Sequence, residues 1–234
     1  IYHKFGYDQA MSRASDSLSY VYRLDEKYWL MMLDSCMCEP VHETGGKLSE
    51  ETVAWMKTQL EEAKKQGVTV IPVSHHNLLD ESTLYPEECT IENTKEVTAL
   101  LEAYGVPVYL SGHLHLQRIK KHTSNLNTPG GYGIREIVTS PLPMAPCQYS
   151  ILNWQADGSL SYHTKKVDIA GWAQRYGEED ENLLNFDAYA DQFLVDVISE
   201  QAFKALQSAS KDIKEEMARL YADMNRDYCS GTKI

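Results

Sequence analysis

The sequence predicts a layered α/β fold with a helical segment at its C-terminal end. The first observation is a pair of apolar runs, residues 68–74 and 106–111, each of which follows an amphipathic stretch of helical length. This alternation of helix and strand is typical of layered α/β domains. The second is a series of short strand-like runs on either side of this pair. The third is that apolar residues recur at helical spacing from about residue 185 onward.

The first elements expected are two strands joined by a turn. Residues 19–24 and 28–33 are strand-like, and the polar residues Asp25, Glu26 and Lys27 lie between them. This pattern indicates a hairpin. The second strand is apolar throughout, so we expect it to be covered on both faces of the sheet.

Two helices are expected to precede the two apolar strands. The first runs from Ser49, a suitable N-cap, to Gly67, a suitable residue just beyond a helix end. The second covers residues 94–104 and ends before Gly105. Apolar residues spaced three or four apart define one face of each helix. They are Val53, Met56, Leu60 and Ala63 in the first helix, and Val97, Leu100, Leu101 and Tyr104 in the second.

The sequence pattern of the remaining residues predicts more strands, followed by helices. Strand-like runs occupy residues 116–119, 134–139, 148–154 and 160–167. The pair Asp157-Gly158 lies between the last two runs and indicates a tight hairpin turn.

An acidic stretch, residues 178–181, marks the expected domain boundary. We expect residues 1–170 to belong to one domain and residues 171–234 to form an acidic linker with a helical appendage. The apolar residues of this appendage are expected to be buried by packing against the main domain, although they could instead form a partner or membrane face. They are Phe186, Tyr189, Phe193, Val197, Ile213, Met217, Leu220, Met224 and Tyr228.

The composition argues against some classes of function. The chain has 34 Asp and Glu residues against 22 Lys and Arg residues, so its formal net charge is −12. This charge opposes binding to nucleic acid or to anionic lipid. No run of eighteen apolar residues occurs, so we expect no membrane span. The five cysteines show no Cys-x-x-Cys spacing, and we expect them to be reduced thiols.

Histidines follow both apolar strands, at the points where the strands are expected to end. His75 and His76 follow the first, and His113 and His115 follow the second after Gly112. The carboxyl ends of neighbouring strands in such a sheet usually form the ligand site, and neutral imidazole is the commonest metal ligand in proteins. The second pair would point the same way if the strand continued, or could reach two different ions if the chain turned at the glycine.

These motifs closely resemble the last two metal motifs of the calcineurin-like metallophosphoesterases. The residues concerned are Gly-His-Leu-His at 112–115 and Val-Ser-His-His at 73–76. Further similarities lie at residues 32–35, 46–49 and 136–141, and the resemblance covers about residues 18–165.

The resemblance implies a four-layer metallophosphoesterase β-sandwich flanked by helices, of which residues 1–170 would be the C-terminal half. It implies two divalent metal ions, of manganese, iron or zinc, with His75 and His113 on one and His115 on the other. His76 is a candidate for binding substrate, for orienting a neighbour or for capping the strand end. The implied reaction is hydrolysis of a phosphate mono- or diester. No catalytic residue is assigned, because the family's leaving-group acid usually comes from an earlier motif.

The sequence departs from the family pattern in its N-terminal part. No Asp-x-His, Gly-Asp-x-x-x-Asp or Gly-Asn-His-Asp/Glu motif precedes residue 75, and the chain begins with Ile1. We therefore expect a piece of a longer phosphoesterase that by itself binds metal weakly and turns over little or nothing. The alternatives are a non-catalytic scaffold of the same fold and a simple histidine-cluster metal module. Residues 77–90 are either a specificity loop or an ordinary surface loop. The sequence favours neither a cytoplasmic nor an exported protein.

Overall fold

The structure, a computed structural model, describes residues 6–38, 43–81, 88–122, 133–155 and 157–232. The chain divides into two compact units. The first, here called the sheet unit, comprises residues 1–114 and 118–138. The second, called the helical unit, comprises residues 115–117 and 139–234.

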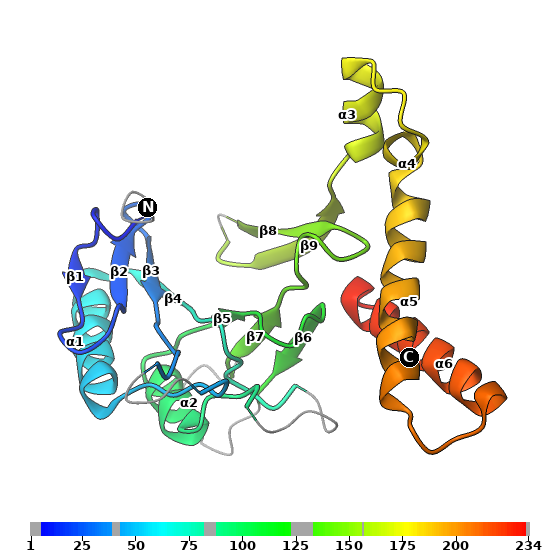
Figure 1. The fold of residues 1–234 in the computed structure, drawn as a ribbon. Coiled ribbons are helices and arrows are strands. Elements are labelled where there is room, and N and C mark those ends of the chain that lie inside the picture. The colour runs from blue at the N-terminus through cyan, green and yellow to red at the C-terminus, as the bar shows by residue number, and fades with distance from the viewer. Residues whose placement is uncertain (1–5, 39–42, 82–87, 123–132, 156, 233–234) are drawn as a thin grey trace. The chain divides into compact units, whose positions relative to one another are not determined.

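A seven-stranded mixed sheet forms the framework of the sheet unit (Figure 1). Its strand order is β1-β2-β3-β4-β5-β7-β6; β3, β4, β5 and β7 are parallel neighbours, and antiparallel pairs lie on both sides of them. The strands are β1 (Ser12–Arg13), β2 (Tyr20–Arg23), β3 (Tyr28–Met32), β4 (Thr69–Val73), β5 (Val108–Ser111), β6 (Arg118–Lys121) and β7 (Arg135–Val138). The predicted α/β class is confirmed.

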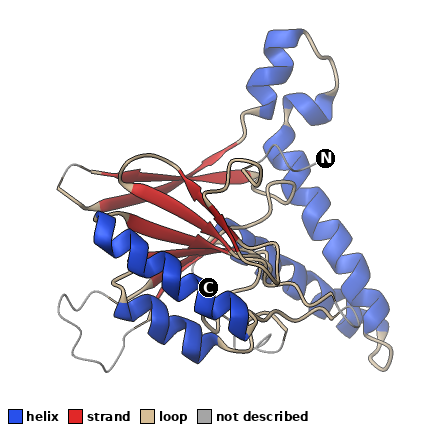
Figure 2. Ribbon diagram, turned by 90° about the vertical axis from the view of Figure 1, so that its left-hand side faces the viewer, coloured by secondary structure: helices blue, strands red, loops and turns tan. Residues whose placement is uncertain are grey.

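Two helices connect the parallel strands: α1 (Glu50–Gln66) joins β3 to β4, and α2 (Thr94–Ala103) joins β4 to β5. Since both crossovers run between adjacent strands in the same direction along the sheet, their common handedness places both helices on the same side (Figure 2). The Ser49 side chain caps α1 by accepting a hydrogen bond of 2.9 Å from the Thr52 amide. Gly67 ends it in the left-handed conformation, with φ 68°. Both predicted caps are confirmed.

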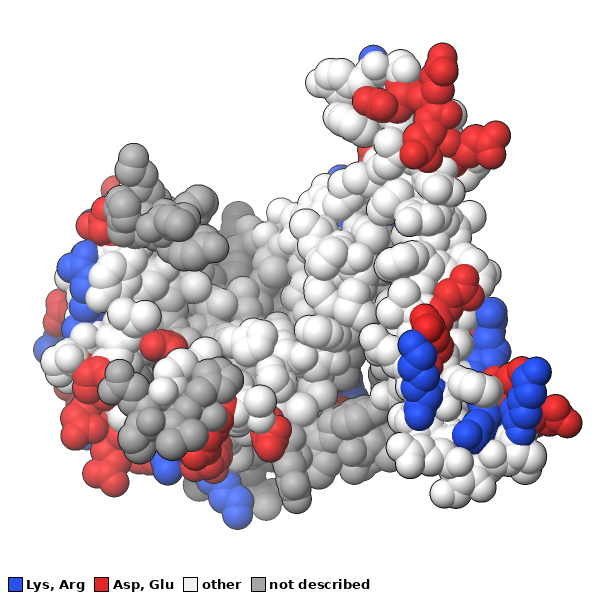
Figure 3. Space-filling model, viewed as in Figure 1, with Lys and Arg blue, Asp and Glu red and all other residues white. Residues whose placement is uncertain are grey.

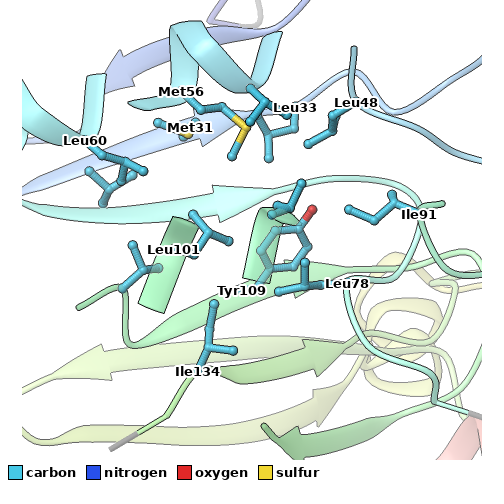
Figure 4. Close-up of a cluster of buried hydrophobic side chains, with 14 of the residues drawn as sticks. Met31, Leu33, Leu48, Met56, Leu60, Leu78, Ile91, Leu101, Tyr109 and Ile134 are labelled. Atoms are coloured by element: carbon cyan, nitrogen blue, oxygen red, sulfur yellow. The ribbon is translucent and has the colours of Figure 1, made fainter. Parts of the chain in front are cut away.

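The core of the sheet unit lies between these helices and the sheet (Figure 4). Met56 and Leu60 of α1 and Leu101 of α2 meet Met31 of β3 and Tyr109 of β5 in one cluster. Each is almost inaccessible to water, and burying one such side chain stabilises the fold by about 1.5–3 kcal/mol. The helical faces predicted from the spacing of apolar residues are therefore the faces that pack against the sheet.

Strand β3 differs from the prediction that both of its faces are covered. Trp29 and Met31 are buried, whereas the alternate residues Tyr28, Leu30 and Met32 are only partly so. Successive side chains of a strand point to opposite faces, so one face of β3 lies in the core and the other is partly open.

The helical unit begins with the predicted hairpin. Strands β8 (Gln148–Trp154) and β9 (Leu160–Lys166) pair in antiparallel register. Gly158 adopts a positive φ of 82° in the turn, and its amide donates to the Gln155 carbonyl at 3.0 Å. The hairpin prediction is confirmed.

Four helices complete this unit: α3 (Ile169–Tyr176), α4 (Glu181–Leu184), α5 (Phe186–Ala205) and α6 (Lys211–Ser230). Helical structure thus starts earlier than residue 185. Acidic side chains gather where α3 connects to α4 (Figure 3), in agreement with the acidic stretch at residues 178–181. The division between residues 170 and 171 stays a prediction. No helix among the described residues has both the length and the apolar character required to cross a bilayer.

Helices α5 and α6 pack on each other, but not through the residues expected to be buried. The buried residues are Leu194 and Val195 of α5 and the small residues Ala218, Ala222 and Cys229 of α6. Several of the predicted core residues are instead exposed by more than a third: Tyr189, Phe193, Ile213, Met217, Leu220 and Tyr228. Helical spacing identifies a face but does not determine which face is covered, and close helix packing favours small residues.

Candidate functional site

The loops that follow β4 and β5 are joined by the backbone. The Ser74 amide donates to the Leu110 carbonyl at 3.0 Å, and the Gly112 amide donates to the His75 carbonyl at 3.0 Å. These bonds continue the parallel pairing of the two strands beyond their ends. They fix the starting points of the two histidine-bearing loops relative to each other.

His75 and His113 meet at this edge of the sheet, as predicted. His75 Nε2 and His113 Nδ1 lie 3.0 Å apart, and the ring centroids are 4.9 Å apart with nearly perpendicular planes. His75 is exposed and His113 is half-buried. Two nitrogens bound about 2.1 Å from one ion at right angles lie about 3 Å from each other. The observed separation is that of a hydrogen bond between the two rings, and it also brings the two nitrogens close enough to bind one ion together.

His76 takes a different position, turned into the protein. It is buried, and Ser35 Oγ lies 2.8 Å from Nδ1 while the Thr44 carbonyl lies 3.0 Å from Nε2. A carbonyl only accepts, so Nε2 carries the proton and Nδ1 accepts from the serine hydroxyl. The ring packs 4.6 Å from that of His113. This geometry favours the alternative in which His76 orients a neighbour; its substrate-binding role stays a prediction.

Gly46 makes room for the His76 ring. A Cβ atom at position 46 would overlap the imidazole. The Gly46 backbone also forms bridges to Cys36 and to Ile91, so it cannot easily move away. The glycine is needed here for close approach and not for an unusual φ.

A buried carboxylate, that of Glu136 on β7, holds the two histidine loops from inside. It accepts hydrogen bonds of 2.6 Å from the amides of Leu78 and Leu79 and from the Ser111 hydroxyl. Residues 78 and 79 follow the first histidine pair, and Ser111 precedes the second. Burial raises the pKa of Glu136, although these three donors act in the opposite direction. A single fully buried side chain thus connects both loops.

Asn77 adds a second connection between the same loops. Its Nδ2 donates to Ser111 Oγ at 2.9 Å and to the Gly112 carbonyl at 3.2 Å. Neither Asn77 nor Glu136 belongs to a motif that predicts a role for it. The available signal was an acidic residue inside the strand-like run 134–139, because a charge that becomes buried in a sheet requires partners.

Glu81 lies beside this network. It is buried, and its Oε2 is 3.3 Å from Nε of Arg118 on β6. Burial, followed by the neighbouring Glu136 carboxylate, raises the pKa of Glu81 to about 7. Lys120 and Arg118 oppose this rise. Because Glu136 receives three hydrogen bonds that favour its charged form, we assign the proton of the pair to Glu81.

The Gly-His-Leu-His segment turns and does not continue the strand. β5 ends at Ser111, and His113 and His115 both adopt positive φ angles, of 60° and 53°. Of the two geometries left open by the sequence, the turned one is present. His115 is exposed and belongs to the helical unit, where its surroundings are described below.

The described part of the chain contains no group of three or more His, Cys, Asp or Glu residues arranged to hold a metal ion. The histidine pair 75/113 fits as two ligands of an incomplete set. The loop 77–90 is described at its two ends, where the Asn77 amide donates to the Cys89 carbonyl and the Ile91 amide to the Asn77 carbonyl, both at 2.9 Å. Residues 82–87 of the candidate specificity loop lie outside the described residues.

Comparison with known proteins gives two similarities. Residues 168–234 match a family model described as the C-terminal domain of cyclic nucleotide phosphodiesterase. The chain is also similar to a solved dimetal phosphatase from Danio rerio, with 14% identity and a TM-score of 0.43, over 55% of this chain and 51% of that one. It thus spans about half of that structure, and a likeness this weak carries no argument. The search of curated proteins found no match. Both descriptions name phosphoesterases.

Proposed function

We propose that this chain contributes histidine ligands to a metal-dependent phosphoesterase. His75 and His113 bind one divalent ion, and His115 binds a second. The observation that carries the proposal is the 3.0 Å separation of His75 Nε2 and His113 Nδ1 at the ends of two parallel strands. Imidazole ligands are compatible with manganese, iron and zinc, so the ligand type alone does not select among them.

The protein's part in this function is to arrange ligands in advance. A dinuclear centre, when bound, polarises a phosphoryl oxygen and supplies a nucleophile near neutral pH. Glu136, Asn77 and the backbone bonds between the loops hold the two loops that carry His75 and His113 next to each other. Positive ions would also allow a chain of net charge −12 to accept an anionic substrate.

The substrate class that we propose is a phosphate ester, and more narrowly a diester. The family model matched by residues 168–234 is named for a cyclic nucleotide phosphodiesterase, which supports the diester. The family resemblance of the histidine motifs is compatible with either a monoester or a diester.

Metal binding by the chain tests the proposal directly. In a calorimetric titration with Zn²⁺ or Mn²⁺, we expect His75→Ala and His113→Ala each to weaken binding by tenfold or more. His163→Ala is the matched control, because His163 is an exposed histidine on β9. If all three variants bind like the wild type, the ligand assignment is wrong.

Hydrolysis separates an enzyme from a scaffold of the same fold. The test compares an aryl phosphate monoester, an aryl phosphate diester and a cyclic nucleotide, using the longest available form of the protein with each metal. Metal-dependent turnover that His113→Ala abolishes supports the phosphoesterase. Metal binding without turnover by a protein that contains all the family's metal motifs would favour the scaffold.

A further inference from the structure

Residues 115–117 are held by a different part of the chain from their neighbours in sequence. His113 and Leu114 before them, and Arg118 after them, belong to the sheet unit, whereas these three residues belong to the helical unit. The division therefore falls inside the Gly-His-Leu-His motif. The contacts that hold His115 therefore come from residues 139–234.

The end of α6 contacts this segment through two hydrogen bonds. The Gln117 amide donates to the Tyr228 carbonyl at 2.9 Å, and Cys229 Sγ donates to the His115 carbonyl at 3.0 Å. The two bonds are made by the first residue of the segment, His115, and by its last, Gln117. Leu116 between them is buried. The last turn of α6 thus fixes the backbone on both sides of Leu116.

The anchor itself is firmly held within the helical unit. Cys229 is buried, and burial raises the pKa of its thiol to about 11, so it remains a neutral donor. Its carbonyl accepts a hydrogen bond of 2.9 Å from Gln148 Nε2 on β8. Gly231 ends the helix at φ 79°, and a Cβ there would lie 3.1 Å from the Gln117 carbonyl oxygen. The fit between helix end and segment is close.

We propose that the last turn of α6 positions His115, with Cys229 as the positioning residue. The inference rests on the proposed function in one respect, namely that His115 is a metal ligand. The last turn of α6 then contributes to the metal motif, because it fixes the backbone position of His115. His75 and His113, which are fixed within the sheet unit, should not depend on them.

Amide hydrogen exchange tests the anchor without any metal. In the wild-type chain, the Gln117 amide should be protected, and free exchange there would overturn the proposal. In Cys229→Ala, we expect exchange at Gln117 to become about fivefold faster, as loss of one hydrogen bond predicts. Cys229→Ser retains a donor and should restore protection. Cys147→Ala is the matched control, a buried cysteine of the same unit whose backbone bonds go to Met144 and Val167.

The imidazole NMR signals during a Zn²⁺ titration test the effect on His115. Cys229→Ala should weaken the His115 response about tenfold, as is usual when a supporting contact of a ligand is lost. The response of His75 and His113 should not change. Equal weakening at all three histidines would indicate general loss of structure and overturn the proposal, as would no weakening at all.

The two hypotheses fail in different ways. If Zn²⁺ shifts none of the three histidines in the wild type, the proposed function is wrong, and the exchange experiment still decides whether α6 holds residues 115–117. If Zn²⁺ shifts all three in the wild type and Cys229→Ala responds identically, the function stands and the positioning role is wrong.

Discussion

The two histidines of the Gly-His-Leu-His motif are separated by a single residue in sequence, but they are held by different contacts. His113, like His75, sits on loops tied to a buried carboxylate that accepts three hydrogen bonds of 2.6 Å. The segment of His115 is held by two bonds to the end of α6: the Gln117 amide donates to the Tyr228 carbonyl, and the Cys229 thiol donates to the His115 carbonyl. Hydrogen bonds to a charged group are roughly twice as strong as those between neutral groups, and a thiol is a weak donor.

This difference indicates that the 75/113 pair and His115 are supported independently of each other. The positions of His75 and His113 are fixed by the buried Glu136 network of the sheet unit. Removing that network should therefore first lower the stability of the fold. The placement of His115 relies on weaker contacts, so disturbing them should alter its presentation with little loss of stability.

The largest effect is expected from Glu136→Ala. Removing the carboxylate leaves two backbone amides and the Ser111 hydroxyl without their buried acceptor, and each such loss costs about 1–3 kcal/mol. We expect the free energy of unfolding in urea to fall by about 4 kcal/mol. Glu136→Gln keeps one carbonyl oxygen and should lose less. A loss below about 1 kcal/mol in Glu136→Ala would show that the network is not the main support.

The next effect is a pH dependence due to Glu81. Its folded-state pKa, about 7, is above its ordinary value of 4.5. A raised carboxyl pKa contributes stability at low pH that is lost as pH rises through the folded value. We expect the free energy of unfolding to fall by about 2 kcal/mol between pH 5 and 8. Glu81→Gln should flatten this part of the curve, while Glu179→Gln, at an exposed site, should leave it unchanged. An identical slope in Glu81→Gln would refute the assignment.

A smaller effect is expected from Gly46→Ala. The new methyl group would overlap the His76 ring, which is held at both nitrogens, and overpacking of this kind costs about 1–3 kcal/mol. Gly45→Ala is a close control, because its Cβ would lie 3.4 Å from the flexible Met37 Cε. Thermal denaturation of both variants gives the comparison. Equal melting temperatures would mean that His76 can move aside.

The smallest effect is expected from Gln148→Leu in the helical unit. It removes the donor to the Cys229 carbonyl, which should lower the free energy of unfolding by about 1 kcal/mol. Exchange of the Gln117 amide should become faster, and that of the Leu78 amide should not. Gln155→Leu, at an exposed position, should change neither. Faster exchange at both amides in Gln148→Leu would contradict separate support of the two histidines.

Much of the sheet unit could be predicted because its signals are local. Ser49, Gly67 and the apolar spacing of α1 each report on a few neighbouring residues, and the same is true of the Asp157-Gly158 turn. The meeting of His75 and His113 followed from a general property of parallel strands, whose carboxyl ends share an edge.

The remaining features depend on pairings between distant residues. Glu136 joins residues 78, 79 and 111, and no pattern near position 136 specifies those partners. His76 is next to His75 in sequence, yet its role depends on Ser35 and Thr44. The aromatic residues of α5 and α6 illustrate the same limit, because periodicity does not reveal which face a neighbouring helix covers.

The left-handed backbone at His113 and His115 restricts how this motif can evolve. Branched residues are nearly excluded from such a conformation, whereas His, Asn and Asp enter it more readily than most. Two of these three also offer a side-chain oxygen that can bind a cation. In the proposed metal site, replacing either histidine by Asn or Asp would keep the turn and exchange a nitrogen ligand for an oxygen ligand, which changes the metal that the position prefers.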